Sequence, residues 1–489
     1  MQGCRTRSAY LLAGQSAGFV FSYGIRCGTS QRFRCGKTVM STTRTISTVR
    51  VNGSRWLSCP PSKKLLVSKA IPPQEIRCAL WKRFSSTLPT ITTQENTLAV
   101  VKEDGNMLEI HWSEGGKSQF NSTWLRHQCH CEQCKQLGSG QMLVNPSSLP
   151  PLLSIKSALA VNKSVTITWA EDGHTGQIPL GYLQDNAVTD FSLFESIQSS
   201  SPDPLEHIPE VDYGDLIRDK REILRWMSDI SSSGISIVRG TPVKPGTVGD
   251  IAELIAPVQN TIYGHVFQVR NSPNPINAAY STAELPLHTD LVYYESPPGL
   301  QLLHCISCND NIIGGESTFR DGFHAAEELR QLYPDDFSTL VRMAATFQKI
   351  HYERERPVHM RYYRPHIVIN SLGCITAINW SPPFEGPLKI PASEIDAYYM
   401  AYTKFAKLIE DSPRKIQFRL KPGDAVVFNN RRILHGRREF KLCEDTDRFL
   451  EGCYINIDEF KSQLMVYHSM YGTDKQFNFK RVSNQDFYH

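Results

Sequence analysis

Two histidines and an aspartate have the residue types and spacing of a metal site. His288 and Asp290 lie in the run LPLHTDLVYY, and His435 follows in VVFNNRRILHGRREF. Because side chains alternate along an extended strand, His288 and Asp290 are expected to project from one face. Two imidazoles and one carboxylate leave half of an octahedral ion open, as in non-haem Fe(II) oxygenases. The three residues are therefore predicted to be catalytic iron ligands, with a 2-oxo acid and dioxygen filling the open positions.

An arginine downstream favours this interpretation over a chance HxD tripeptide. Arg448 opens the strand-like run RFLEGCYIN, and its planar guanidinium suits the distal carboxylate of 2-oxoglutarate. Arg448, Leu450, Gly452 and Tyr454 have the same parity and are predicted to share one face of that strand. A zinc hydrolase with an activated water could use the same three metal ligands and stays open as an alternative.

Cys129, Cys131 and Cys134 form a second candidate metal site. The chain has 13 cysteines, but they follow no paired framework, so metal binding explains this cluster better than disulfides do. Thiolates and an imidazole in tetrahedral geometry are typical of structural zinc, and a reduced cluster without metal is the alternative. Three histidines could supply the fourth ligand: His127, His130 and His174.

The amino-terminal segment differs in charge from the rest of the chain. Residues 1–74 contain 12 Lys and Arg and no Asp or Glu, and without them 41 bases face 49 acids. An Arg-rich, Ser/Thr-rich leader predicts a disordered mitochondrial transit peptide over residues 1–90 and a location in the matrix, with a basic tail and a cytoplasmic location as the alternative. The acidic body argues against nucleic acid as a partner, and no apolar run is long enough to span a membrane.

The remaining sequence predicts the elements that must position these residues. Short strand-like runs between Gly turns indicate a small β domain over residues 95–190, and a Pro- and Ser-rich stretch at 199–213 is a predicted linker. Strands mixed with helices over residues 205–472 predict a mainly β, α+β fold of the barrel or sandwich type, followed by a polar tail at 473–489.

Individual elements are predicted from periodicity. Strands are expected at 98–101, 107–112, 165–169, 235–238, 300–306, 425–428 and 448–457. Helices are expected at 215–230, 248–258, 322–332 and 392–409.

Seven motifs together resemble the gamma-butyrobetaine and trimethyllysine dioxygenases, within the taurine-dioxygenase-like group. The motifs are TWLRHQCHCEQC, YGHVFQVR, AAYSTAELPLHTD, PPGLQLLHCI, GGESTFRDGF, LKPGDAVVFNNRRILHGRR and DRFLEGCY. The resemblance implies a double-stranded β-helix (jelly-roll) domain that uses Fe(II), 2-oxoglutarate, O2 and ascorbate, preceded by a small zinc-binding β domain. It also implies Arg448 and Ser317 as 2-oxoglutarate ligands and His174 as the fourth zinc ligand, and it suggests a homodimer.

The resemblance further implies a pocket for a small trimethylammonium substrate. A quaternary ammonium has no hydrogen to donate, so proteins surround it with aromatic rings. Matching motif positions place Tyr263, Phe267, Tyr280 and Tyr454 around this group, with Asn277 available for a polar contact.

Two departures from the family pattern bear on the substrate. Trp is expected where this chain has Phe267, a weaker ring for cations, and often Tyr where it has Leu291. The implied reaction is hydroxylation of gamma-butyrobetaine to L-carnitine in carnitine biosynthesis, with succinate and CO2 as coproducts. Trimethyllysine is the alternative substrate, favoured by the leader and by YYESPPG and DGFHAAEEL. A non-catalytic small-molecule-binding relative is an alternative of another class.

Overall fold

The computed structural model describes residues 97–187, 207–270, 281–371, 373–441 and 447–473. The predicted transit peptide lies outside them, as do Asn277, Tyr280 and nearly all of the predicted tail. The boundaries 95–190 and 205–472 stay predictions, because residues 188–206 are not described. Within the described ranges, no helix combines the length and apolarity that a membrane crossing requires.

The first folded part consists of two antiparallel three-stranded sheets. One contains β1 (Leu98–Val101), β2 (Met107–His111) and β3 (Lys117–Asn121). The other contains β4 (Ile155–Val161), β5 (Ser164–Trp169) and β6 (Thr175–Pro179). Every second residue of β5 is buried, so Val165, Ile167 and Trp169 enter the core between the sheets while their neighbours face outward. Two short helices, α1 (Ser122–His127) and α2 (Leu180–Asp185), follow β3 and β6.

The second folded part contains a six-stranded sheet. Its order is β7 (Glu210–Asp212), β8 (Ile235–Arg239), β19 (Ala425–Asn429), β11 (Leu300–Cys308), β22 (Arg448–Ile455) and β9 (Phe267–Arg270). Strands β19 and β22 are buried along their whole length, because helices cover one face and a second sheet covers the other. The predicted linker at 199–213 is wrong at its end, since Glu210–Asp212 pairs with β8 in parallel and thereby satisfies its backbone hydrogen bonds.

A four-stranded sheet faces the large one. Its order is β10 (Leu285–His288), β20 (Ile433–Arg437), β13 (Ser317–Asp321) and β18 (Ile416–Phe418). Side chains from both sheets, including Phe319, Val426 and Phe428, form one hydrophobic cluster between them. This arrangement confirms the predicted jelly-roll (double-stranded β-helix) fold. Three strand pairs complete it: β12 (Ile313–Gly314) with β21 (Phe440–Lys441), β14 (Ala344–His351) with β15 (Val358–Pro365), and β16 (Ile367–Ile369) with β17 (Ile375–Ile378).

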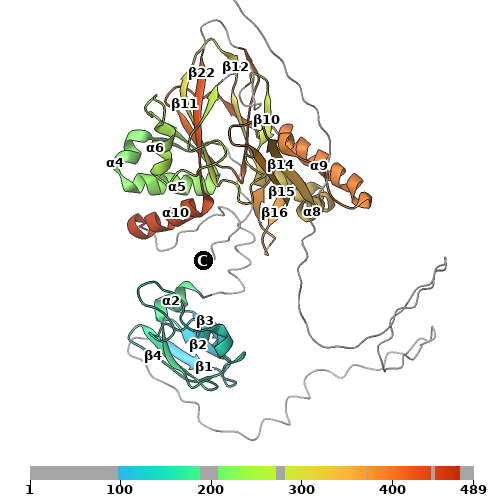
Figure 1. Ribbon diagram of the computed structural model, residues 1–489. Coiled ribbons are helices and arrows are strands. Elements are labelled where there is room, and N and C mark those ends of the chain that lie inside the picture. Colours follow the sequence, from blue (N-terminus) through green and yellow to red (C-terminus); the bar gives the residue numbers. More distant parts are fainter. Residues whose placement is uncertain (1–96, 188–206, 271–280, 372, 442–446, 474–489) are drawn as a thin grey trace, which may run out of the picture. The chain divides into compact units, whose positions relative to one another are not determined.

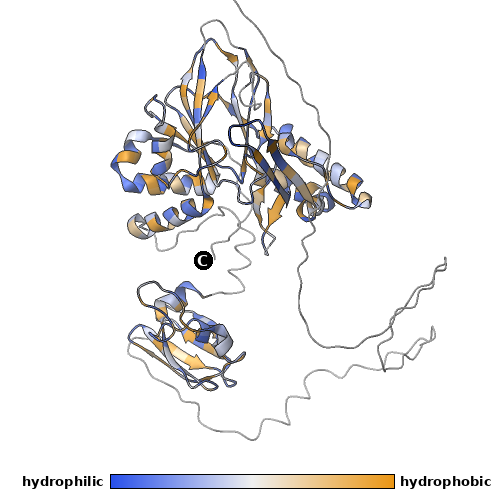
Figure 2. Ribbon diagram, viewed as in Figure 1, coloured by the Kyte–Doolittle hydropathy of each residue, from blue (hydrophilic) through white to orange (hydrophobic). Residues whose placement is uncertain are grey.

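Helices lie on two sides of the sheets (Figure 1). One group packs on the large sheet: α4 (Tyr213–Arg218), α5 (Lys220–Ser233), α6 (Thr247–Glu253) and α10 (Ile457–Tyr471). The other group borders the small sheet and the pair β14–β15: α7 (Gly322–Leu332), α8 (Pro334–Arg342) and α9 (Ile395–Glu410). Polar and apolar residues alternate around α5 and α9, so each helix has a face to bury (Figure 2).

Two predicted helices are shorter than their periodicity indicated. The helix expected at 215–230 is two helices, because Asp219 is extended and its side chain accepts a hydrogen bond from the amide of Arg221 to begin α5. The helix expected at 248–258 ends as α6 at Glu253. Local apolar spacing continues through both points and therefore did not reveal the breaks.

Candidate active site

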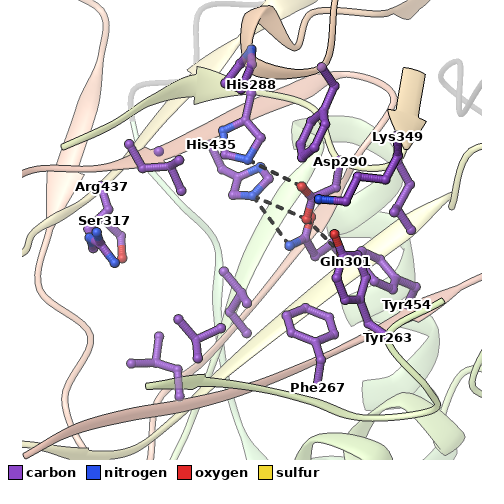
Figure 3. Close-up of a pocket in the computed structure, with 18 of the residues that line it drawn as sticks. Tyr263, Phe267, His288, Asp290, Gln301, Ser317, Lys349, His435, Arg437 and Tyr454 are labelled. Carbon is purple, nitrogen blue, oxygen red and sulfur yellow. Dashed lines mark hydrogen bonds and ion pairs between the residues drawn. The ribbon is translucent and has the colours of Figure 1, made fainter. Parts of the chain in front are cut away.

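Paired strands bring the three predicted iron ligands together. His288 ends β10 and lies directly opposite His435 on β20, so both imidazoles point to the same side of the small sheet. The ligand atoms of His288, Asp290 and His435 all lie within 4.8 Å of one another. Figure 3 shows the two rings and the carboxylate converging at one end of a pocket. One ion can therefore contact all three.

Asp290 reaches the site by a turn, which differs from the prediction. Strand β10 stops at His288, and Leu291 has the left-handed φ of 57°, so the segment is not extended through Asp290. Asn430 holds the turn: its Oδ1 accepts from the Asp290 amide at 2.8 Å, and its Nδ2 donates to the Asp290 carbonyl at 2.9 Å. Asn430, in the NNRR run before β20, was not recognised from the sequence.

The electrostatics of the three residues suit a cation. His288 Nε2 lies 3.3 Å from Asp290 Oδ1, and His435 Nε2 lies 3.8 Å from Oδ2. Burial alone would raise the pKa of Asp290, but the hydrogen bond from His288 and the two neighbouring imidazoles lower it far below its usual range. Burial and the neighbouring His288 lower the pKa of His435 to about 3. The carboxylate is thus ionised and His435 neutral, as metal binding requires.

A backbone contact also orients the His288 ring for metal binding. The Nδ1 of His288 lies 2.8 Å from the carbonyl oxygen of Pro286 and must carry the proton there. Its Nε2 faces Asp290 and the shared site, so a metal ion that took the place of the Nε2 proton would meet the lone pair of this nitrogen, as hydrogen bonds to the other ring nitrogen arrange for metal-bound histidines. The oriented His288, together with the imidazole of His435 and the carboxylate of Asp290, fits Fe(II) in the facial arrangement.

A cavity of about 290 Å³ extends from these ligands between the two sheets. Phe267 stacks on Tyr454 with ring centroids 5.1 Å apart, and the Tyr263 ring lies 6.2 Å from that of Phe267. Gly452 permits this, because a Cβ there would lie 2.3 Å from Phe267 Cζ. The Tyr454 hydroxyl donates to Asp290 Oδ2 at 2.8 Å, so the aromatic wall contacts an iron ligand.

Further residues line the same cavity. The departure noted in the sequence, Leu291, is among them. Gln301 and Tyr293 also line it and were missed, although Gln301 lies opposite Tyr454 on β11, and its Nε2 is 3.4 Å from His435 Nε2. The alternation of β11 could have indicated Gln301, but Tyr293 lies in the turn after Asp290 and left no periodic signal.

Arg448 and Ser317 also line the cavity, and Figure 3 shows Ser317 on the side away from Phe267. Arg448 and Tyr454 both face the cavity from β22, as the alternation predicted. Arg448 is 8% exposed, and among the described residues no carboxylate pairs with it. Arg437, which the sequence did not single out, lies beside it and donates to the carbonyls of Ser281 and Ala283. A buried guanidinium without a described counterion is suited to an anionic cosubstrate.

The cysteine cluster lies in the first folded part. His174 Nε2 is 3.4 Å from Cys129 Sγ and 3.5 Å from the Sγ atoms of Cys131 and Cys134. A tetrahedral zinc ion with bonds of about 2.3 Å to sulfur and about 2.0 Å to nitrogen places such atoms roughly 3.5 Å apart. His130 instead contacts the Gln128 carbonyl and Lys135. The four side chains are therefore compatible with structural zinc, with His174 in the fourth position.

Two family models match the chain. The model for the taurine catabolism dioxygenase TauD, TfdA family matches residues 197–454, more than half of the sequence. The chain belongs to this family. A model for the gamma-butyrobetaine hydroxylase-like N-terminal region matches residues 99–184, the part that holds the cysteine cluster. The TauD/TfdA protein described here is therefore a dioxygenase of the iron and 2-oxoglutarate class, which argues against the zinc hydrolase and the non-catalytic relative.

Curated relatives are similar over most of their length. Gamma-butyrobetaine dioxygenase of Pseudomonas sp. (strain AK-1) is 29% identical over 366 residues, which cover 73% of this chain and 93% of that protein. The human gamma-butyrobetaine dioxygenase is 28% identical over 373 residues, 74% of this chain and 95% of the relative. A mitochondrial trimethyllysine dioxygenase of Gallus gallus is 25% identical over 385 residues, which cover 75% of this chain and 88% of that protein.

Proposed function

We propose that this TauD/TfdA dioxygenase hydroxylates gamma-butyrobetaine to L-carnitine, with His288, Asp290 and His435 as its Fe(II) ligands. The observation that carries the substrate choice is the hydrogen bond from Tyr454 to Asp290. Tyr454 also forms a wall of the aromatic group with Phe267, so a trimethylammonium bound there lies close to the iron ligands.

The short distance between this aromatic group and the ligands favours butyrobetaine over trimethyllysine. In butyrobetaine the carbon that is hydroxylated is separated from the nitrogen by a single methylene. In trimethyllysine a longer methylene chain separates the hydroxylated carbon from the nitrogen, and that chain would have to fold back to reach the same point. Position relative to the reacting centre decides which carbon reacts.

The other cavity residues have distinct roles in this proposal. Arg448 binds the distal carboxylate of 2-oxoglutarate, and Ser317 donates a hydrogen bond beside it. Bound Fe(II) supplies the activation of dioxygen, coupled to decarboxylation of 2-oxoglutarate to succinate and CO2. Tyr263, Phe267 and Tyr454 orient the substrate and exclude water from its cationic end. As the resemblance implies, Asn277 would make a polar contact with the substrate, and Tyr280 would lie beside its trimethylammonium group.

Trimethyllysine is the second candidate substrate. The acid-free leader predicts import into mitochondria, and the Gallus gallus relative named mitochondrial is a trimethyllysine dioxygenase. The same two observations support a mitochondrial matrix location for this chain. Phe267, a weaker cation-binding ring than Trp, leaves room for a substrate other than butyrobetaine.

A structural role is proposed for the cysteine cluster. Cys129, Cys131, Cys134 and His174 would bind one Zn(II) with no position left for water, so the ion would stabilise the small domain and take no part in turnover.

The substrate proposal is tested by direct comparison of candidates. The enzyme is incubated with Fe(II), ascorbate and 2-oxoglutarate, together with butyrobetaine, trimethyllysine or their unmethylated amines, and products are analysed by mass spectrometry. We expect a gain of one oxygen on butyrobetaine, with matching succinate and with no gain on the unmethylated amine. Preferential oxidation of trimethyllysine would transfer the proposal to the second candidate, and oxidation of neither would overturn it.

A further inference from the structure

Lys349 is a third basic residue in the lining of the cavity, after Arg437 and Arg448. It lies on β14 at the same parity as Ala345 and Phe347, which are both buried, as is Thr346 between them. Strand alternation therefore places Lys349 on the inward face, where an apolar residue would ordinarily pack. Its position calls for a chemical explanation, because a lysine so placed loses hydration without an obvious benefit to stability.

The surroundings of Lys349 leave its charge without a described counterion. Its Nζ lies 5.0 Å from the centre of the Phe384 ring, and among the described residues no carboxylate lies within ion-pair distance of it. Burial lowers the pKa of Lys349, and the charge of Arg354 lowers it further. An anion bound in the cavity would offset both effects.

The direction of the side chain identifies the region in which that anion would lie. Figure 3 shows Lys349 entering from a different wall than Phe267, with its amino group directed toward the end of the pocket that holds Asp290. Asp290 itself is ionised but already bonded to Tyr454 and His288. The distal carboxylate of 2-oxoglutarate is assigned to Arg448. In the proposed function the other carboxylate of 2-oxoglutarate would bind Fe(II). The main substrate is then the remaining source of negative charge.

A cationic substrate alone would not suit this pocket, because like charges at short distance repel in a medium of low dielectric. A zwitterion resolves the conflict: its trimethylammonium group lies among Tyr263, Phe267 and Tyr454, and its carboxylate lies toward Lys349. In butyrobetaine the two charged groups flank the carbon that reacts, so contacts at both ends would hold that carbon in place.

We propose that Lys349 binds the substrate carboxylate and makes the enzyme selective for zwitterionic trimethylammonium acids over simple trimethylammonium cations. The inference rests on the proposed function and adds an anionic group to the required chemistry of the substrate. Lys349 is then a residue that determines specificity by contact with the substrate.

Binding to the holoenzyme tests this directly. Titration calorimetry is performed on enzyme loaded with Fe(II) and 2-oxoglutarate in the absence of O2, with butyrobetaine and with butyltrimethylammonium, which lacks the carboxylate. Lys349→Met keeps much of the length and removes the charge. We expect it to raise the Kd for butyrobetaine about ten- to a hundredfold, since a hydrogen bond to a charged group is lost, and to leave the Kd for butyltrimethylammonium unchanged or lower.

Two further variants distinguish a contact between Lys349 and the substrate carboxylate from a general effect of removing a lysine. Lys349→Arg keeps the charge and should retain most of the butyrobetaine affinity. Lys389→Met is the matched control, because Lys389 is exposed and lies over the Tyr363 ring, outside the cavity lining. The Kd for 2-oxoglutarate and the melting temperature should stay the same in all variants.

The possible failures are distinguishable. If wild-type enzyme binds both ligands and Lys349→Met weakens them equally or not at all, the Lys349 inference is overturned and the proposed function stands. If wild-type enzyme binds neither trimethylammonium ligand, the proposed function fails, and the inference that rests on it fails as well.

Discussion

Asp290 is held from three directions, and each contact serves a different purpose. The Asn430 side chain bonds to the Asp290 backbone, and His288 Nε2 contacts Asp290 Oδ1. The Tyr454 hydroxyl donates to Asp290 Oδ2. The Tyr454 contact links the substrate pocket to the metal site, because the same phenol ring packs against Phe267. Substitutions at this carboxylate and at this phenol should therefore have different consequences.

Loss of a ligand should abolish the reaction. We expect Asp290→Ala or His288→Ala to remove substrate-stimulated release of succinate, since two remaining donors no longer hold Fe(II). Succinate is measured with and without butyrobetaine at saturating 2-oxoglutarate. Asp396→Ala, at an exposed position of α9, is the control and should behave as wild type. Turnover that survives in the ligand variants would show that the iron lies elsewhere.

Loss of the Tyr454 hydroxyl should weaken metal binding and spare the aromatic wall. Tyr454→Phe keeps the ring but leaves Asp290 Oδ2 without its donor, and the loss of a hydrogen bond to a metal ligand costs about ten- to a hundredfold in metal affinity or activity. The measurement is activity as a function of added Fe(II), together with the Kd for butyrobetaine in the loaded enzyme. An unaltered iron requirement would contradict this role. Tyr293→Phe is the control variant, because it removes a hydroxyl that faces Tyr263.

At the scale of elements, the sequence could predict which side chains a strand directs into the cavity, but it could not predict the positions of side chains that lie in turns. The alternation that placed Arg448 and Tyr454 on one face is a local property of β22, so it was readable from spacing alone. The position of Asp290 depends on the left-handed Leu291 and on Asn430, which is distant in sequence. Such a contact leaves no periodic signal.

The same limit explains the lining residues that were overlooked. Lys349 lies in the polar run QKIHYERER, where a charged residue is unremarkable until the pairing of β14 with β15 defines an inward face. The jelly-roll fold and the zinc-binding region were implied by motif resemblance. The order of strands within each sheet came only with the structure, since it depends on pairs between remote segments.

A carboxyl group beside the pocket wall should make stability depend on pH. Glu385 follows Pro383 and Phe384, which line the cavity, and accepts a hydrogen bond from Tyr402 of α9. Burial raises the pKa of Glu385 to about 7. The folded protein therefore binds a proton that the unfolded chain releases above pH 4.5, so this contribution to stability is present at low pH and lost as pH rises through 7.

Glu385→Gln should remove that dependence. Gln is neutral at every pH and can still accept from Tyr402, so the variant should exceed wild type in free energy of unfolding at pH 8, by up to about 3 kcal/mol, and match it near pH 4, below the unfolded pKa of Glu385. Urea unfolding at both pH values gives the difference. Glu355→Gln, at an exposed site, should show no such trend. A constant difference across this range would mean that Glu385 ionises normally.

For the whole molecule, the two folded parts have separate cores and separate candidate metals. The zinc candidate is surrounded by a hydrophobic cluster that includes Leu125 and Trp169, and Gly176 leaves space for the Cys129 sulfur. The iron candidate lies in the jelly roll. Each metal should therefore stabilise its own part of the chain.

Zinc removal should unfold one part and spare the other. Calorimetry of the full chain with a zinc chelator, or of Cys131→Ser, is expected to lower or abolish one melting transition and leave a second transition nearly unchanged, because a small domain with a limited core depends on its metal. Proteolysis should then cut within residues 97–187. Re-addition of Zn(II) should restore the wild-type protein and not the variant. Equal loss of both transitions would indicate that the two parts unfold together.

Leu291 points to a conflict that directed evolution would encounter. Its left-handed backbone, φ 57°, costs roughly 1–2 kcal/mol for a residue with a Cβ, yet its side chain forms part of the cavity lining. Gly or Asn would relax that backbone and remove the isobutyl group from the wall. Leu291 is also buried in the hydrophobic cluster beside the pocket, and losing such a side chain costs about 2–5 kcal/mol, which exceeds the strain relieved. Libraries screened for heat resistance should thus retain Leu here despite its strained backbone.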